Sequence, residues 1–272
     1  MIYFPNSKIN IGLNIISKRN DGFHNIETIL YPLSLCDILE VRPKQIGNTS
    51  LEVSNMIIED ENLCLKAYNL LKKNYPYLPE VSIHLIKNIP SQAGLGGGSS
   101  DAAFTLKLLN SECELNLSEL ELEKFARELG SDCAFFIYNI PCYAYEKGDK
   151  FYNTTLSLRG KTILLVKPNI SISTAEAYSE VVAQKTEYNL LNIVENLPIA
   201  QWRHFIKNDF EKTLFKKYKE LELIKDKMYE IGALYAQMSG SGSTIYGLFD
   251  RDLTPDEINL FDYPFVCNRI LK

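Results

Sequence analysis

The sequence predicts an α+β protein in which antiparallel strands and helices flank a glycine-rich loop. Three observations lead to this fold class. Residues 8–16 alternate apolar and polar side chains, which is typical of a half-buried strand. Residues 90–101 form a glycine-rich loop between a strand pattern and a helix pattern. Residues 233–249 form a strand, a glycine-serine turn and a second strand within a largely helical second half.

The composition is that of a globular protein. The chain has 272 residues, of which 46% are hydrophobic and 23% charged, enough for one large domain or two of ordinary size. No apolar stretch approaches the ~20 residues that a spanning helix needs. The N-terminus lacks the basic start and apolar run of a signal peptide, so we expect a cytoplasmic protein without a membrane partner. The net charge of −5 argues against a nucleic-acid partner.

The cysteines and histidines give no sign of a disulfide framework or a zinc site. The six cysteines lie at irregular spacings without a C-x-x-C pair, so we expect buried free thiols. The three histidines are isolated and H-E-x-x-H is absent. We therefore predict no protein-ligated transition metal, and the ligands of any other metal stay unknown.

Periodicity predicts the remaining elements along the chain. Apolar alternation and apolar runs predict strands over residues 8–16, 26–41, 81–86, 162–168 and 265–271. Apolar residues spaced by three and four predict helices over residues 61–73, 99–110, 118–129, 209–230 and 255–261. A turn-rich stretch at 150–160 marks a weak boundary. It divides the chain into an N-terminal domain, 1–155, and a C-terminal domain, 156–272.

The strongest sign of chemistry is the loop PSQAGLGGGSSD at residues 90–101. Four glycines within five residues allow positive φ and close approach of a ligand to the backbone. Ser99 or Ser100 is expected to cap the following helix, with Asp101 in its first turn, so that loop and helix form an anion cradle. The alternative, a flexible linker or a tight turn, is disfavoured because the loop leads directly into that helix. The Walker A pattern fails because no lysine follows the glycines, and Ser99 stands where G-x-G-x-x-G needs glycine.

This loop closely resembles the P-x-x-x-G-L-G-[GS]-S-S-x-A motif of the galactokinase, homoserine kinase, mevalonate kinase and phosphomevalonate kinase (GHMP) superfamily. Its triple glycine is typical of the family that acts on 4-diphosphocytidyl-2-C-methyl-D-erythritol, a cytidine diphosphate-linked methylerythritol. Three more segments resemble that family, in family order: KINIGLNIISKRNDGFHNIETIL at 8–30, LGSDCAFF at 129–136 and SGSGSTIYGLF at 239–249. The resemblance implies a two-domain fold, with a ribosomal-S5-like N-terminal domain and a ferredoxin-like C-terminal domain.

The resemblance implies a small-molecule kinase that uses ATP and Mg²⁺. Lys8 would stabilise charge on the transferring phosphoryl group, and Asp132 would accept the proton of the acceptor hydroxyl. Taken alone, Lys8 is more typical of a solvated edge residue and Asp132 is equally compatible with a cap, but their matched positions favour catalysis. The residues after Asp132 depart from the commoner Val-Pro, being Cys133 and Ala134. The implied ATP-binding residues are Pro90, Ser91, Gln92, Ala93, Gly94, Leu95, Gly96, Gly97, Gly98, Ser99 and Ser100.

The resemblance also implies a cytidine pocket. Phe23 stands where the family usually has tyrosine, and it keeps the face needed to stack on cytosine. His24 would hydrogen-bond the edge of the base, and Asn10 would bind the polyol. Thr174 would supply a polar contact and Tyr178 a second stacking ring, although an ordinary core role for Tyr178 is equally possible.

The implied reaction is phosphorylation of the substrate's 2-hydroxyl in non-mevalonate isoprenoid precursor biosynthesis. Asn62 either approaches adenine or caps a helix, and the turn at 239–243 either borders the phosphates or only closes a hairpin. Two alternatives to this function are kept. A sister kinase for mevalonate, phosphomevalonate or homoserine conflicts with R-x-D-G-F-H, and an inactive nucleotide-binding regulator conflicts with the presence of Lys8 and Asp132. The sequence does not determine the oligomeric state.

Overall fold

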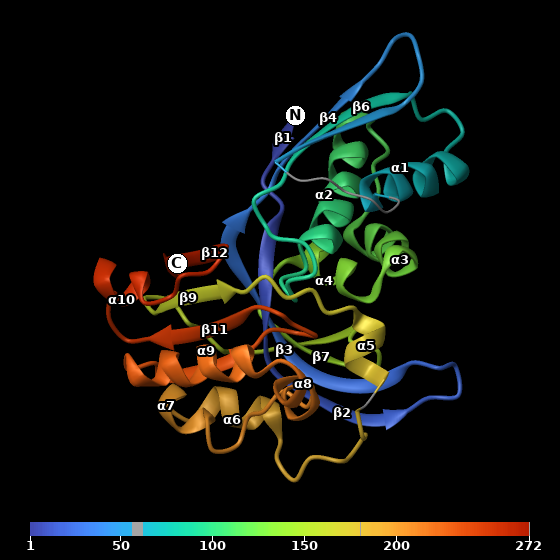
Figure 1. The fold of residues 1–272 in the computed structure, drawn as a ribbon. Coiled ribbons are helices and arrows are strands. Elements are labelled where there is room, and N and C mark those ends of the chain that lie inside the picture. Colours follow the sequence, from blue (N-terminus) through green and yellow to red (C-terminus); the bar gives the residue numbers. More distant parts are fainter. Residues whose placement is uncertain (56–61, 180, 272) are drawn as a thin grey trace. The chain divides into compact units, whose positions relative to one another are not determined.

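Figure 1 shows the fold in a computed structural model that describes residues 1–55, 62–179 and 181–271. The chain divides into two compact units that interleave along the sequence. Unit 1 comprises residues 1–8, 35–91 and 96–140, and unit 2 comprises residues 9–34, 92–95 and 141–272. Both units combine helices with mainly antiparallel strands, which confirms the α+β class. The division into sequence domains at residue 155 stays a prediction.

Unit 1 contains a four-stranded sheet in the order β1-β4-β6-β5. Its strands are β1 (Ile2–Tyr3), β4 (Ile38–Pro43), β5 (Ser50–Ser54) and β6 (Val81–Ile86). Strand β4 pairs antiparallel with β1 and β6, whereas β5 runs parallel to β6. Leu39 lies opposite Leu85 and Val41 opposite Ile83, so the buried side chains of the two central strands line up.

The helices of unit 1 pack around one central helix, α2 (Gly97–Glu112), which also packs against β4 of this sheet. The others are α1 (Leu63–Asn74), α3 (Glu119–Leu129) and α4 (Phe135–Tyr138), with a short 3₁₀ turn η1 (Ser131–Cys133). In Figure 1, α1 and α2 lie on one side of β4 and β6. Asn62 caps α1, because its side chain accepts a hydrogen bond of 2.7 Å from the Cys64 N–H. A capping box of Ser118 and Glu121 starts α3.

Unit 2 is built on two sheets. The first has the order β2-β3-β7-β8, formed by β2 (Asn6–Lys18), β3 (His24–Cys36), β7 (Cys142–Tyr145) and β8 (Lys150–Asn153). The second has the order β10-β11-β9-β12, formed by β9 (Thr162–Lys167), β10 (Tyr235–Met238), β11 (Ile245–Phe249) and β12 (Phe265–Ile270). All pairs in the second sheet are antiparallel.

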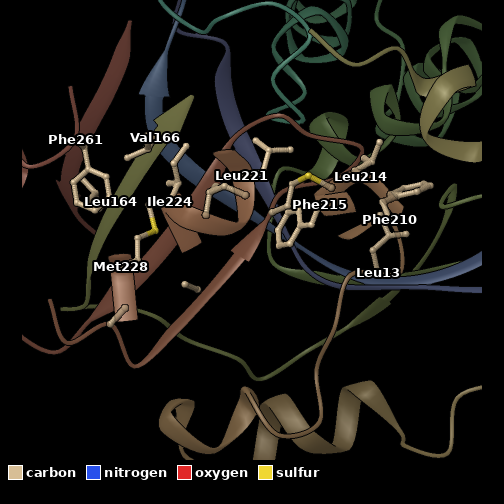
Figure 2. Packing of buried hydrophobic residues seen from close by; sticks show 14 of the residues in the cluster. Leu13, Leu164, Val166, Phe210, Leu214, Phe215, Leu221, Ile224, Met228 and Phe261 are labelled. Atoms are coloured by element: carbon tan, nitrogen blue, oxygen red, sulfur yellow. The ribbon is translucent and has the colours of Figure 1, made fainter. Parts of the chain in front are cut away.

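The helices of unit 2 pack a hydrophobic core against the second sheet. They are α5 (Thr174–Ser179), α6 (Leu190–Asn196), α7 (Ile199–Trp202), α8 (Glu211–Lys217), α9 (Lys219–Glu230) and α10 (Pro255–Asn259). Leu221, Ile224 and Met228 recur at helical spacing along α9 and are fully buried. Figure 2 shows them in one cluster with Leu164 and Val166 of β9. This apolar stripe explains why the polar remainder of α9 folds as a surface helix.

The structure corrects several predicted boundaries. The extended segment predicted over 26–41 is interrupted at Asp37, where β3 ends and β4 begins. The helix predicted over 209–230 is broken at Tyr218, whose non-helical backbone separates α8 from α9. Strands β5, β7 and β8, of four or five residues each, were not predicted. Strand β8 lies inside the stretch that was interpreted as a domain boundary.

Two further findings concern membranes and thiols. In the described ranges, no helix is both long and apolar enough to cross a bilayer. All six cysteines are free thiols. Cys64, Cys133, Cys142 and Cys267 are buried, as predicted, whereas Cys36 and Cys113 are only half-buried. The cellular compartment stays a prediction.

Candidate active site

Lys8 and Asp132 form an ion pair within unit 1. The Nζ of Lys8, on β2, lies 3.2 Å from Oδ2 of Asp132, in η1. The Lys8 side chain is only 4% exposed, whereas that of Asp132 is 39% exposed. Lys8 is therefore no solvated edge residue, because its ammonium is withdrawn from water beside a carboxylate. The carboxylate of Asp132 still reaches solvent, where it can meet a ligand.

Gly96 brings the start of α2 next to Lys8. Its φ is +71°, in the left-handed region that favours glycine. A Cβ on this residue would lie 3.0 Å from Cε of Lys8 and 3.0 Å from Cζ of Phe136. Conformation and space thus both require glycine here. The Lys8–Asp132 pair and the first turn of α2 consequently share one region of unit 1.

The first turn of α2 differs from the predicted one. The helix begins at Gly97 with Gly96 as its N-cap, so the expectation that Ser99 or Ser100 caps it was wrong. Asp101 consequently lies beyond the first turn. Glycine has no side chain that could accept a hydrogen bond from the first N–H groups of the helix. These groups therefore donate to no N-cap side chain, an arrangement that elsewhere binds anions.

Gly97 and Gly98 have different surroundings. Gly97 is buried, and a Cβ on it would lie 2.9 Å from Cγ2 of Ile89 and 3.3 Å from Nζ of Lys87. Gly98 is exposed, and the nearest atom to its Cβ would be Cδ1 of Leu63 at an ordinary 3.6 Å. Packing therefore demands glycine at 97 but leaves room at 98. A ligand that approaches the backbone would explain the glycine at 98.

The remaining loop residues vary in exposure. Ser91 and Gln92 are exposed, Pro90 is half-buried, and Ala93 and Leu95 are buried. Ser99 is half-buried, and burial raises the pKa of the neighbouring Cys133 thiol to about 12. Ser100 is fully buried. Direct ligand contacts are thus open to only part of this loop.

A buried charge cluster lies beside Gly97. The ammonium of Lys87 donates to Oδ2 of Asp37 and, at 2.7 Å, to Oδ2 of Asp101. Oδ1 of Asp37 also accepts from the two backbone N–H groups that follow Lys87. One cation between two carboxylates leaves excess negative charge, and burial raises the pKa of Asp101 to about 7. Sequence reasoning missed this cluster, because nothing in the spacing of its members signals a contact.

In unit 2, the turn at residues 239–243 packs against Gly94. The hydroxyl of Ser239 donates a hydrogen bond of 2.9 Å to the Gly94 carbonyl and accepts one of 3.2 Å from the Asn10 N–H. A Cβ on Gly94 would lie 1.9 Å from the Ser239 carbonyl oxygen, so no side chain fits. The turn therefore does more than close a hairpin, since it touches the 92–95 part of the glycine-rich loop.

Asn10 is held by several elements of unit 2. Its Nδ2 donates to Oγ1 of Thr28 on β3 at 3.1 Å, and its carbonyl accepts from the Tyr246 hydroxyl on β11 at 3.0 Å. Its Oδ1 would lie 3.1 Å from a Cβ on Gly240. Asn10 is 4% exposed, so its amide is fixed in orientation before any ligand binds.

His24 and Tyr178 stack on one another. Their ring centroids are 4.8 Å apart and their planes are inclined by 19°. Tyr178 is half-buried and meets Phe210 edge-on at 4.9 Å, so it belongs both to the core margin and to an aromatic stack. Burial, helped by Lys18, lowers the pKa of His24. The imidazole is consequently neutral at neutral pH, the form suited to hydrogen-bond an uncharged base.

Phe23 lies on the surface of unit 2. Its side chain is 57% exposed, and Nζ of Lys147 lies 5.3 Å from its ring centroid, within cation–π range. Thr174 is also exposed, at the first position of α5, the helix that carries Tyr178. The structure thus pairs His24 with Tyr178 and pairs Phe23 with Lys147.

Comparison with known proteins identifies the family. Residues 62–139 match the GHMP kinases N terminal domain, and residues 192–258 match the GHMP kinases C terminal family. A Parabacteroides distasonis protein named 4-diphosphocytidyl-2-C-methyl-D-erythritol kinase is 47% identical over 267 residues, which cover 98% of each chain. A Cytophaga hutchinsonii protein of the same name is 50% identical over 259 residues, which cover 92% of this chain and 93% of its own.

Solved structures agree. A crystal structure of 4-(cytidine 5'-diphospho)-2C-methyl-D-erythritol kinase matches with a TM-score of 0.77 and 29% identity, over 96% of this chain and 93% of that one. The Methanococcus jannaschii mevalonate kinase matches with a TM-score of 0.71 at 18% identity, over 99% and 96% of the two chains, and this supports the fold alone. The chain therefore belongs to the GHMP kinases and, within them, to the 4-diphosphocytidyl-2-C-methyl-D-erythritol kinase family.

Proposed function

We propose that this protein transfers the γ-phosphoryl group of ATP to the 2-hydroxyl of 4-diphosphocytidyl-2-C-methyl-D-erythritol, a step of non-mevalonate isoprenoid precursor synthesis. The observation that carries the chemistry is the Lys8–Asp132 pair beside Gly96, where α2 begins without a side-chain cap. The name shared by relatives at 47% and 50% identity supports this acceptor.

The start of α2 would bind the ATP phosphates. Gly98 is exposed and leaves its backbone open to approach, and the first N–H groups of a 16-residue helix point toward the same end. Such N–H groups and the helix dipole bind phosphate without any cationic side chain. This accounts for a phosphate site in a loop without the lysine of a Walker A motif.

Asp132 would act as the general base and Lys8 as the charge-stabilising cation. Asp132 accepts the proton of the acceptor hydroxyl as the hydroxyl oxygen bonds to the γ-phosphorus, and the bond from that phosphorus to the bridging β-phosphate oxygen breaks, so that ADP leaves. Lys8 keeps Asp132 oriented through their 3.2 Å contact and offsets negative charge on the phosphoryl oxygens.

The residues near the start of α2 would hold Mg²⁺ only together with the phosphates of a bound nucleotide, as is usual for Mg²⁺ in kinases. Among residues 1–55, 62–179 and 181–271, no three or more His, Cys, Asp or Glu side chains form a metal cage. Mg²⁺ with ATP commonly needs just one or two protein oxygens, of which the hydroxyl of Ser99 near the start of α2 would provide one. When bound, it would neutralise charge on the phosphates.

Unit 2 would recognise the acceptor. The neutral imidazole of His24 suits the edge of cytosine, and Phe23 and Tyr178 offer aromatic faces for its ring. The fixed amide of Asn10 suits a polyol hydroxyl, and Thr174 offers an exposed hydroxyl.

A coupled assay of ADP release tests the proposal. The wild-type protein is given ATP, Mg²⁺ and one acceptor at a time: the cytidylated methylerythritol, mevalonate, phosphomevalonate or homoserine. We expect turnover with the first acceptor alone. Turnover with another acceptor would identify a sister kinase, and tight ATP binding without turnover would identify a regulator; either result would contradict the proposed function.

A further inference from the structure

The segment Asn208-Asp209-Phe210-Glu211 contacts two parts of unit 2 that the proposed function uses, the turn at 239–243 and the ring of Tyr178. It follows α7 and ends with the first residue of α8, and nothing in its sequence suggested a role. We propose that Asn208 is a positioning residue of the kinase site, which holds the turn at 239–243 against the glycine-rich loop. This inference rests on the proposed function.

The side chain of Asn208 is fully used. It is 2% exposed, and its Nδ2 donates to the carbonyls of Met238 and Gly240, both at 2.8 Å. Its Oδ1 accepts from the Phe210 N–H at 3.0 Å. Two carbonyls facing one nitrogen require an amide here. Aspartate would place an oxygen against them, and leucine would leave them without this donor.

These two carbonyls flank Ser239. The hydroxyl of Ser239 links the Gly94 carbonyl to the Asn10 N–H, so its place determines how the turn meets the glycine-rich loop. Asn208 holds the backbone on both sides of that hydroxyl. It therefore fixes the 92–95 part of the glycine-rich loop through Ser239.

The rest of the segment anchors Asn208. Leu13 of β2 exchanges backbone hydrogen bonds of 2.9 Å with residues 207 and 209, and the carboxylate of Asp209 accepts from the Ile15 N–H at 2.7 Å. Figure 2 shows Phe210 beside Leu13 in the core. The carboxylate of Glu211 accepts from the Met238 N–H at 2.8 Å. These bonds tie the segment to β2 and β10 independently of the Asn208 side chain.

Asn208→Leu should therefore impair the phosphate side selectively. We expect its kcat/KM for ATP to fall about 10- to 100-fold, the effect of a displacement of about 1 Å in a catalytic site. The KM for the cytidylated substrate should rise by a smaller factor, because Ser239 also holds the Asn10 N–H whereas the His24–Tyr178 stack lies further from the Asn208 amide. General destabilisation of the fold would not affect the constants for ATP more than the KM for the cytidylated substrate. Leu221→Ala, a truncation in the same core, is the matched control, with lowered thermal stability and near-parental constants.

The decisive measurement is a double-variant cycle with Ser239→Ala. If Asn208 acts through Ser239, the double variant should be no more than about twofold worse in kcat/KM for ATP than the poorer single variant. The inference would be overturned if the losses in kcat/KM of the two single variants multiplied in the double variant. It would also be overturned if Asn208→Leu shifted both KM values by the same factor, or if it kept the parental constants. If Asn208→Leu does not fold, Asn208→Asp keeps the volume and the acceptor for Phe210, and the same cycle applies.

Calorimetric ATP binding without acceptor separates this inference from the proposed function. If the wild-type protein shows no turnover with the cytidylated acceptor, the proposed function is refuted. A weaker ATP affinity of Asn208→Leu than of the wild type would still support the positioning role. Conversely, wild-type turnover together with unchanged ATP binding and kcat in both Asn208 variants refutes the positioning role alone.

Discussion

At the scale of single residues, the side chain of Lys8 is buried whereas that of its partner Asp132 is partly exposed to solvent. The buried ammonium of Lys8 depends on the carboxylate of Asp132, because a buried charge without its partner is costly. The carboxylate is 39% exposed and can also meet a substrate. A residue that combines access with a fixed cationic partner suits a general base. This asymmetry separates the pair from surface ion pairs such as Lys161–Asp250.

Asp132→Asn should lower turnover by about 10²–10⁴, the usual contribution of a positioned base. ATP affinity should hardly change, since the amide keeps the shape of the side chain. Steady-state kinetics and calorimetry check the two parts. Asp250→Asn, which removes an exposed carboxylate, should retain parental turnover. If Asp132→Asn stays within a few fold of the parent, Asp132 has no part in the mechanism.

Phe23→Ala tests the cytidine side. Stacking of a base on an aromatic ring is worth roughly 1–3 kcal/mol, or about 5- to 150-fold in affinity. The KM for the cytidylated substrate should rise by that factor, and the KM for ATP should not. Because Phe23 is 57% exposed, the melting temperature should match that of Tyr152→Ala, a control at a similarly exposed ring. Unfolding of Phe23→Ala would instead assign the ring to the core.

At the scale of elements, α2 links helix geometry to phosphate binding. Gly96 is the last residue of the loop, and both its left-handed backbone and its close neighbours require glycine. The first N–H groups of the helix that follows have no side-chain cap. Gly97 is required by Ile89, a packing reason that the sequence pattern hides. A substitution there would mix loss of stability with loss of binding, so Gly98 is the informative position.

Gly98→Val should weaken ATP binding more than about tenfold, or about 1.4 kcal/mol, because its side chain would stand where the phosphates approach. The fold should survive, since the added Cβ meets only Leu63 at 3.6 Å. Gly98→Ala should raise helix stability by up to about 1 kcal/mol while also weakening ATP binding. Thermal unfolding and calorimetry measure both quantities. Parental ATP affinity in Gly98→Val would refute the phosphate site.

At the scale of the whole molecule, the Lys87–Asp37–Asp101 cluster should make the free energy of unfolding depend on pH. Burial raises the pKa of Asp101 from 3.8 to about 7, against the attraction of Lys87. The folded state then holds a proton that the unfolded state has lost between these values. Stability should therefore fall as pH rises from about 4 to about 7, with a slope from this group of at most about 1.4 kcal/mol per pH unit.

Asp101→Asn should flatten that pH dependence, because the amide cannot titrate. Two groups that also face Asp101 stay protonated in this window: burial raises the pKa of the Cys64 thiol to about 12, and against the effect of burial the two carboxylates raise the pKa of Lys87. Urea unfolding at pH 5 and pH 7.5 measures the slope, with Asp250→Asn as a surface control. An unchanged slope in Asp101→Asn would show that Asp101 titrates normally.

The sequence by itself determined the elements whose signals are local. Alternation located β6, apolar spacing located α1, α2 and α3, and the glycine-rich loop with its flanking motifs pointed to the family. Such patterns depend on which side of one strand or helix is buried, and that is written in consecutive residues. The pair of Lys8 and Asp132 entered only through resemblance, since no spacing links residues so far apart.

Only the tertiary structure decided the contacts made across long sequence separations. It placed Lys87 between Asp37 and Asp101, and it bonded the Asn208 amide to the carbonyls of Met238 and Gly240. It also showed that neighbouring side chains exclude a Cβ at Gly97 but leave room for one at Gly98. The left-handed Gly96 likewise moved the start of α2 ahead of the serines. For Lys87 and Asn208 the cause is the burial of polar groups, whose hydrogen-bond partners come from distant parts of the chain. For Gly96 and Gly97 the cause is the space left by side chains that the fold brings close, together with the left-handed backbone of Gly96.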